Sequence, residues 1–333
     1  MVSNKNVHIQ KMIKESLITK AKTVLHIPKT YLSPPNFVQI ESTTKCNMKC
    51  KQCIRGPGEN FDMSFELYKS IVDQLILTRF GTRHVDLTGV GEPLLNPNLE
   101  AMVDYAKRRD FRVSFTSNFM LMNESRAADV VGSGVDYLYA SVDGGNKETY
   151  EKIRVGANYE KFISNIEHFM EIKSKLDVDK PTLRFYVALQ DDNVKEIQDF
   201  IELASGLGIS LVNFNRLVIP GKEHWTIGIP VLDIWKSLPD NEVIGRRGIP
   251  LEVYQPCVAL KGCFVTYDGK VLPCNNLTQM ISREEYESYC FGDLAEDTLY
   301  DVWFSKDYRK FRVDLARGAR PSFCEYCSHA YQF

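Results

Sequence analysis

Apolar, β-branched segments alternate with amphipathic segments between residues 37 and 216, and this alternation constrains the fold more than any other feature of the chain. It predicts a parallel sheet whose strands are joined by right-handed helical crossovers. The pattern leaves open whether the sheet is doubly wound or curls into a partial barrel. The predicted strands are FVQIES (37–42), HVDLTG (84–89), FRVSFTS (111–117), VDYLYASVD (135–143), TLRFYVAL (182–189) and SLVNFNRL (210–217). The predicted helices span 63–78, 98–108, 123–132, 158–176 and 193–206.

Polar and glycine-rich segments follow the predicted strands. Glu41 and a cysteine-containing loop come after the first strand, TGVGEP after the second, TSN after the third and SVDGG after the fourth. Because the carboxyl ends of parallel strands lie at one edge of the sheet, reactive residues gather there in both candidate architectures. We therefore expect one face of the domain to carry the chemistry.

The chain contains nine cysteines, an odd number that cannot all form disulfides. The first thirty residues lack the apolar core of a signal peptide, and no stretch of 18 apolar residues occurs elsewhere, which predicts a cytoplasmic protein without membrane contact. Since the cytoplasm keeps thiols reduced, clustered cysteines there indicate metal binding. The two groups are Cys46, Cys50 and Cys53, and then Cys257, Cys263, Cys274, Cys290, Cys324 and Cys327.

The first group lies in the loop TTKCNMKCKQC, residues 43–53. Structural zinc sites and ferredoxin clusters use a full set of four ligands. Three thiolates on a cubane cluster leave one iron without a protein ligand, which is useful where a substrate or cofactor binds that iron. The alternative is a zinc site that a distant His or Cys completes.

The CxxxCxxC loop after a strand of an α/β unit resembles the cluster-binding loop of the radical S-adenosylmethionine (SAM) enzymes. The resemblance implies a partial (β/α)6 TIM-like barrel, a 4Fe–4S cluster held by Cys46, Cys50 and Cys53, and SAM chelated to the free iron. It also implies one-electron cleavage of SAM to a 5′-deoxyadenosyl radical and an electron donor of the flavodoxin or ferredoxin type. The sequence departs from the family at Gln52, where an aromatic residue near the adenine is usual.

Two further segments resemble the SAM-binding parts of the family. LTGVGEPLL resembles the Gly-Gly-Glu motif, whose glycines let the backbone approach the amino group of the cofactor. YASVDGGNKETYEKIR resembles the segment that contacts its ribose and carboxylate, and an arginine there can bind a carboxylate through two N–H groups. For Asp143 and Asn118 a local hydrogen-bonding role is an equal alternative. The predicted cofactor-binding residues are Gly89, Gly91, Glu92, Asn118, Ser141, Asp143 and Arg154.

A second cysteine pattern begins at Cys257, where eleven residues separate Cys257 from Gly269 and four separate Gly269 from Cys274. This pattern resembles the SPASM and twitch modules, which hold auxiliary iron–sulfur clusters. FGDLAEDTLYDVWFSKDYRKFR and PSFCEYC extend the match, and Asp268-Gly269 predicts a hairpin turn. The alternative is a zinc ribbon. The resemblance implies one auxiliary 4Fe–4S cluster held by Cys257, Cys274, Cys324 and Cys327.

Two cysteines lie outside this ligand set. Cys263 has a spacing from Cys257 that resembles a ligand pair of the sulfatase-maturing branch, so it is an alternative to Cys324 or Cys327. Cys290 is expected to be a buried inert thiol, with a hydrogen-atom donor to a substrate radical as the catalytic alternative.

The predicted organisation is a helical extension (1–35), a radical SAM partial barrel (36–218), a linker (219–250) and a SPASM/twitch domain (251–333). We expect hydrogen abstraction, followed by oxidation or rearrangement of a small polar metabolite such as a sugar or aminocyclitol. Only 36 residues precede the first strand, which favours this substrate class over peptides bound through a leader-recognition domain. Maturation of a ribosomal peptide, by crosslinking or epimerisation, and a non-catalytic iron–sulfur or zinc scaffold are the alternatives.

Strand alternation places Asn213 and Asn215 on one face and Arg216 near the strand end, and these are the predicted substrate contacts. The formal net charge of −2 gives no reason to expect a nucleic-acid partner.

Overall fold

The computed structural model describes residues 33–53, 60–77, 82–216, 244–245, 257–280, 285 and 287–324. Its centre is a nine-stranded sheet with the order β7-β6-β5-β4-β3-β2-β1-β8-β9. All neighbouring strands are parallel except for the antiparallel pair β8 and β9. The strands are β1 (Phe37–Ile40), β2 (His84–Asp86), β3 (Arg112–Ser117), β4 (Tyr137–Ser141), β5 (Thr182–Leu189), β6 (Val212–Arg216), β7 (Ile244–Gly245), β8 (Gly262–Val265) and β9 (Val271–Leu272).

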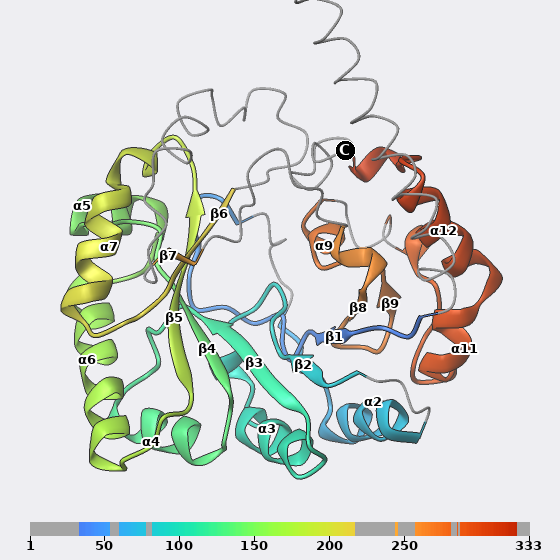
Figure 1. The fold of residues 1–333 in the computed structure, drawn as a ribbon, viewed down its shortest axis with the longest axis horizontal. Helices are drawn as coiled ribbons and strands as arrows, with labels where there is room; N and C mark the ends of the chain where they lie inside the picture. The colour runs from blue at the N-terminus through green and yellow to red at the C-terminus, as the bar shows by residue number, and fades with distance from the viewer. Residues whose placement is uncertain are drawn as a thin grey trace, which may run out of the picture.

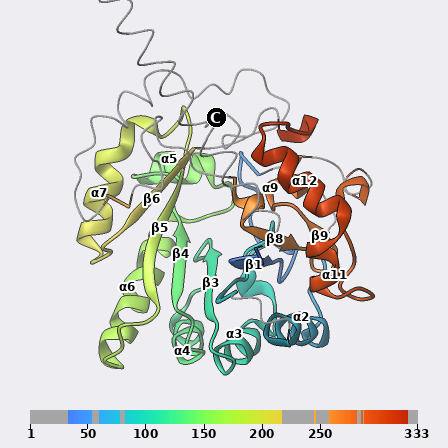
Figure 2. The same cartoon turned by 45° about the vertical axis from the view of Figure 1, so that its right-hand side comes forward.

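Helices cover the outer side of the sheet, which curves from β6 round to β1 (Figures 1 and 2). Because β7 and β9 lie at its two edges, the sheet is open, as a partial barrel requires. The α-helices are α2 (Phe65–Leu77), α3 (Leu99–Lys107), α4 (Glu124–Gly132), α5 (Lys147–Ile153), α6 (Tyr159–Lys175), α7 (Ile197–Gly206), α9 (Asn276–Met280), α11 (Leu299–Phe304) and α12 (Lys306–Ala316). Short 3-10 helices are η1 (Pro93–Leu95), η2 (Val194–Glu196), η3 (Val258–Leu260), η4 (Glu287–Tyr289) and η5 (Ser322–Cys324).

Local sequence explains these elements. Along β5 the residues alternate strictly between half-buried and buried, so every second side chain enters the core and the intervening ones face the inside of the curved sheet. Helix α6 begins where the Asn158 side chain accepts a hydrogen bond from the Lys161 backbone N–H, and its buried stripe includes Phe162, Ile166 and Phe169. The strands and helices thus share one apolar layer.

The predicted strands and helices of residues 37–216 are confirmed, with ends that differ by a few residues. The α5 helix was not predicted, because its segment KETYEKI is short and buries only Tyr150 and Ile153. The predicted hairpin at Asp268-Gly269 is also present, with Gly269 in the left-handed region at φ 96°. The predicted extension falls almost entirely outside the described residues.

The cysteine-rich carboxy-terminal segment continues the barrel sheet. Strand β8 pairs with β1 over four residues, including Val38 opposite Cys263, so the two parts share backbone hydrogen bonds. Of the predicted linker, only Ile244–Gly245 are described, and they add a parallel strand beside β6. No helix in the described ranges is long and apolar enough to cross a membrane.

Candidate functional site

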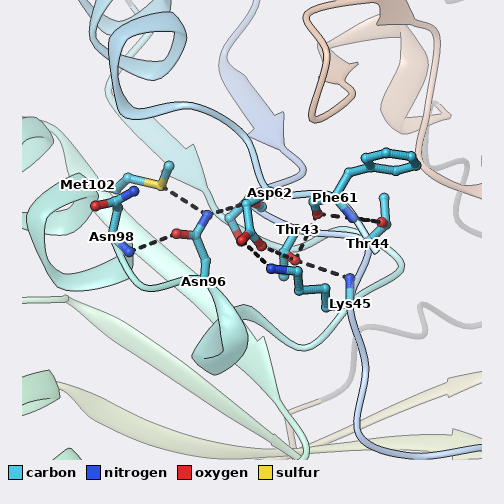
Figure 3. A network of polar contacts seen from close by, with 9 residues as sticks. Thr43, Thr44, Lys45, Phe61, Asp62, Asn96, Asn98 and Met102 are labelled. Carbon is cyan, nitrogen blue, oxygen red and sulfur yellow. Dashed lines mark hydrogen bonds and ion pairs between the residues drawn. The ribbon is translucent and has the colours of Figure 1, made fainter. Parts of the chain in front are cut away.

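The cysteine loop follows β1 and is held in place from three sides. The Lys45 carbonyl accepts a hydrogen bond from the Glu92 backbone N–H at 2.7 Å. The backbone N–H groups of Lys49 and Lys51 donate to carbonyls at the end of α5, at 2.9 and 2.8 Å. Figure 3 shows the third anchor, where Thr43 donates to Asp62 at 2.7 Å and Lys45 forms an ion pair with the same carboxylate. These contacts fix the loop at the carboxyl edge of the sheet.

The three thiols of this loop lie near one another. Cys46 and Cys50 are half-buried and pack against the main core, whereas Cys53 is exposed. Burial raises the pKa of Cys50 to about 11, against the opposing effect of Arg154, and charges on Cys53 and Cys46 would raise it further. Within the described part of the chain, no three Cys, His, Asp or Glu side chains are arranged to hold a single metal ion. A cubane places its ligands on different iron atoms, which needs a wider spacing.

Gly89 lies against Glu41, directly after β1, and Gly91 lies against the cysteine loop. A Cβ added to Gly89 would lie 2.4 Å from Cγ of Glu41, and one added to Gly91 would lie 2.3 Å from the Thr43 carbonyl oxygen. The space beside both glycines is therefore filled by protein. Packing against neighbouring protein atoms is therefore a reason for glycine at both positions, and their predicted contact with the cofactor stays a prediction.

Glu92 and Asn118 connect three segments of the site. The Glu92 carboxylate is 3% exposed and accepts hydrogen bonds from Ser117 Oγ at 2.8 Å and from the Asn118 backbone N–H at 2.6 Å. Burial raises the pKa of Glu92, and these hydrogen bonds oppose that rise. The Asn118 side chain donates to Asn47 Oδ1 in the cysteine loop at 2.8 Å. Both side chains therefore have local partners, which the sequence analysis had considered only for Asn118.

Asp143 is the centre of a buried polar cluster. Its Oδ2 accepts a hydrogen bond from Gln52 Nε2 and forms an ion pair with Arg154 NH2, both at 2.7 Å. Its Oδ1 accepts from the Ala188 backbone N–H at 2.8 Å. Burial lowers the pKa of Arg154, but the nearby negative charges, above all that of Asp143, outweigh it and hold that pKa above its usual value. Ser141, two residues before Asp143 and also buried, lies beside Tyr186 of β5.

Several atoms around this cluster are buried without a hydrogen-bond partner in the structure as described. They are Arg154 Nε, Gln52 Oε1 and both amide atoms of Gln190. A buried polar group without a partner is costly, so such atoms mark places where a ligand is expected. Sequence reasoning treated Gln52 only as a departure from an aromatic preference and missed its contact with Asp143, which joins positions 91 residues apart.

The predicted substrate contacts lie on β6. Asn213 is 3% exposed and stands opposite Tyr186 in the sheet. Asn215 and Arg216 stand opposite Ala188 and Leu189, and their side chains are outside the described part of the structure.

The second cysteine group divides between two environments. Cys257 and Cys274 pack against one small apolar cluster that is formed by η3 and the end of α12. Cys324 is half-buried in η5, and Cys327 lies outside the described residues. Cys263 is 2% exposed within the main core, and burial raises the pKa of its thiol to about 12. The Cys290 thiol donates to the Gly292 carbonyl at 3.1 Å. Cys290 is half-buried rather than buried as expected, and it packs with Cys274 against a second small apolar cluster. The arrangement favours Cys257 and Cys274 over Cys263 as ligands, and the role of Cys290 stays a prediction.

Comparison with known proteins decides the family. The model of the radical SAM superfamily matches residues 40–204, and that of the SPASM iron–sulfur cluster-binding domain matches residues 257–328. This chain belongs to the radical SAM superfamily. It is a radical SAM enzyme with a carboxy-terminal SPASM module, and its cofactors are SAM, a 4Fe–4S cluster and an auxiliary cluster.

Individual relatives differ in what their names describe. The chain is 24% identical over 323 residues to the tungsten-containing aldehyde ferredoxin oxidoreductase cofactor-modifying protein of Pyrococcus furiosus, covering 88% of this chain and 87% of the relative. The crystal structure of Streptococcus suis SuiB bound to precursor peptide SuiA matches with TM-score 0.66 and 15% identity, over 99% of this chain and 76% of SuiB. BtrN in complex with AdoMet and 2-DOIA matches with TM-score 0.54 and 18% identity, over 88% and 92%. The two structural likenesses support the fold.

The residues present fit these cofactors. The first loop supplies three thiols within electrostatic reach of one another, and Arg154 provides a buried cation beside them. The Nε atom of this arginine has no partner among the described residues, so it can bind an anionic group such as a carboxylate. In the second group, two thiols share an apolar wall, as a buried iron–sulfur cluster requires.

Proposed function

We propose that Cys46, Cys50 and Cys53 hold the first cluster and that the buried cluster of polar side chains around Asp143 binds SAM beside it. The unpartnered atoms of Arg154, Gln52 and Gln190 carry this proposal. Gln52 lies in the cysteine loop, Arg154 shares the Asp143 carboxylate with it, and Gln190 directly follows the strand whose Ala188 N–H donates to Asp143. When bound, the reduced cluster and SAM supply a 5′-deoxyadenosyl radical that removes a hydrogen atom from the substrate.

The protein contributes position and exclusion of water. Asp143 orients the guanidinium of Arg154 and the amide of Gln52, and it is itself fixed by the Ala188 backbone N–H. Ser141 and Asn118 end neighbouring strands at the same edge of the sheet, where they can hydrogen-bond the cofactor. Gly89, Gly91 and Glu92 hold the loop after β2 against the cysteine loop. A rigid site of this kind places one substrate C–H bond near the radical and keeps other hydrogen donors away.

For the substrate we propose a small polar molecule that is dehydrogenated or rearranged. The inner face of β5 presents Arg184 and Tyr186, Gln190 directly follows the strand, and buried polar atoms of Arg184 and Gln190 lack hydrogen-bond partners in the described structure. Asn213 of β6 lies beside Tyr186 of β5. We propose that Asn213, Asn215 and Arg216 complete this polar surface. Groups of this kind suit hydroxyl and amino groups better than apolar side chains.

A peptide substrate is the second candidate, favoured by the likeness to SuiB bound to its precursor peptide. The two candidates separate in an anaerobic assay with dithionite and SAM, in which small-molecule and peptide fractions from the source organism are supplied separately. The proposal predicts that only the small-molecule fraction raises 5′-deoxyadenosine formation above the uncoupled rate and that mass spectrometry finds one of its components consumed. Stimulation by the peptide fraction alone would support the second candidate.

We propose that Cys257, Cys274, Cys324 and Cys327 hold the auxiliary cluster, which would supply a one-electron acceptor when bound. Iron content tests both ligand sets. Anaerobically reconstituted protein should contain about eight irons, and Cys50→Ala and Cys274→Ala should each contain about four. Cys263→Ala is the matched control, because the core position of this thiol predicts full iron content. Loss of iron from Cys263→Ala would instead assign Cys263 as a ligand.

A further inference from the structure

Arg312 on α12 is a fully buried arginine that makes no salt bridge or hydrogen bond with any residue that the structure describes. Its exposed fraction is 0%, and Nε, NH1 and NH2 all lack a hydrogen-bond partner there. The guanidinium lies over the ring of Trp303 at 3.8 Å and over that of Tyr308 at 4.7 Å. Burial lowers the pKa of Arg312 to about 10, so the side chain is still cationic at neutral pH.

Two aromatic faces stabilise a buried cation only in part, and an uncompensated buried charge is strongly unfavourable. Arg154, which is also buried, illustrates the usual solution, since its guanidinium meets the Asp143 carboxylate at 2.7 Å. No equivalent carboxylate faces Arg312 in the described segments, and the nearby Cys263 is a buried thiol that stays protonated. The missing counter-charge must therefore come from something that binds.

The position of Arg312 on its helix indicates which bound group supplies the counter-charge. Leu315 and Ala316 follow three and four residues later on α12, so they share the face of the helix that carries Arg312. These two residues pack with the cluster that contains Cys257 and Cys274. Tyr308, stacked near the guanidinium, also lies within electrostatic reach of both cysteines. The face of α12 that carries this buried cation thus also carries the two residues that pack with the proposed ligands Cys257 and Cys274.

We propose that Arg312 is a positioning residue for the charge of the auxiliary iron–sulfur cluster and that its guanidinium stabilises the reduced form. The proposal rests on the auxiliary cluster of the proposed function. Four thiolates make the bound cluster a net anion, and uptake of one electron adds one more negative charge. A nearby buried cation therefore stabilises the reduced state more than the oxidised state and raises the reduction potential.

The test is a redox titration followed by electron paramagnetic resonance. Protein in which Cys46, Cys50 and Cys53 are all replaced by alanine isolates the auxiliary cluster. In this background Arg312→Met should lower the ratio of reduced to oxidised cluster at a fixed potential at least tenfold, which is about 59 mV for a one-electron couple. Arg312→Lys should retain most of the wild-type potential. Lys310→Met is the matched control, because that lysine lies on the same helix but its side chain is 71% exposed.

Iron content and stability separate the possible outcomes. If the background protein binds no iron, the auxiliary cluster of the proposed function fails. If Arg312→Met retains its iron and titrates at the same potential as Lys310→Met, the role of Arg312 is overturned. A purely structural role predicts that iron-free Arg312→Met unfolds at a lower temperature, whereas our proposal predicts no loss, since an unpaired buried charge has been removed. Loss of iron from Arg312→Met but not Arg312→Lys supports the proposal, and loss from both contradicts it.

Discussion

Replacing Asp143 by asparagine removes the charge that faces Arg154 while keeping the shape of the side chain. The carboxylate is 1% exposed and the arginine side chain 10% exposed, so water screens this pair only weakly. Removal of one partner from a buried ion pair costs about 3–5 kcal/mol. Because the asparagine oxygen can still accept one hydrogen bond, from Ala188 or Gln52, we expect a loss near the lower end of this range.

Thermal unfolding of iron-free protein under anaerobic conditions measures this loss. With an unfolding entropy of about 2.1 cal/mol/K per residue over a chain of 333 residues, a decrease of about 3 kcal/mol corresponds to a Tm lower by roughly 4 °C. The matched control is Glu160→Gln, which removes a carboxylate from an ion pair with Lys147 whose side chains are 60% and 56% exposed, and which should leave the Tm unchanged. Arg154→Met combined with Asp143→Asn should destabilise by less than the sum of the two single changes. A Tm for Asp143→Asn equal to that of the control would refute the reasoning.

Three further predictions concern the rest of the barrel. Gly91→Ala places a Cβ 2.3 Å from the Thr43 carbonyl oxygen, so the protein should lose the first cluster only and keep about four irons. Gly132→Ala is the control, because no atom lies within 4 Å of its added Cβ, and it should bind about eight irons. Because the pKa of Glu92 is raised, the folded protein keeps a proton at pH values where the unfolded chain has released it. The stability that this proton confers is complete below the unfolded-state pKa and is lost as the pH rises through the folded-state pKa. Glu92→Gln should therefore show a flatter dependence of Tm on pH between mildly acidic and neutral conditions, and an unchanged slope would contradict the assignment. Asn158→Ala removes the amino-terminal cap of α6 and should cost about 1 kcal/mol in urea unfolding, without any change in iron content.

The positions and the parallel direction of the barrel strands could be predicted because apolar periodicity is a local property of the sequence, whereas the periodicity left open the choice between a doubly wound sheet and a partial barrel. In β5 the alternation of half-buried and buried positions is the same pattern that TLRFYVAL displays as letters. The cysteine spacing was equally local, and it led to both family domains. Pairing of β8 with β1 was not predictable in this way, because it joins segments more than 220 residues apart and depends on how the whole chain packs.

The limits of sequence reasoning are clearest at polar residues. Gly91 reads as a glycine of a cofactor-binding motif, yet the atom that excludes a side chain there belongs to Thr43. Gln52 reads as a departure from the family pattern, and only the folded chain shows that it is a partner of Asp143. Arg312 is the last residue of FGDLAEDTLYDVWFSKDYRKFR, yet that motif gives no reason to single it out, because what sets it apart is the lack of a described partner for a buried charge. Such features arise from contacts between distant segments.

Formation of 5′-deoxyadenosine tests the central claim most directly. Anaerobically reconstituted protein is mixed with dithionite and SAM, and the nucleoside is measured by chromatography and mass spectrometry. If Cys46, Cys50 and Cys53 hold a cluster that SAM can bind, 5′-deoxyadenosine accumulates even without the true substrate, and Cys50→Ala forms none. If the protein carries its full iron content and forms no more 5′-deoxyadenosine than Cys50→Ala, the proposed site is wrong.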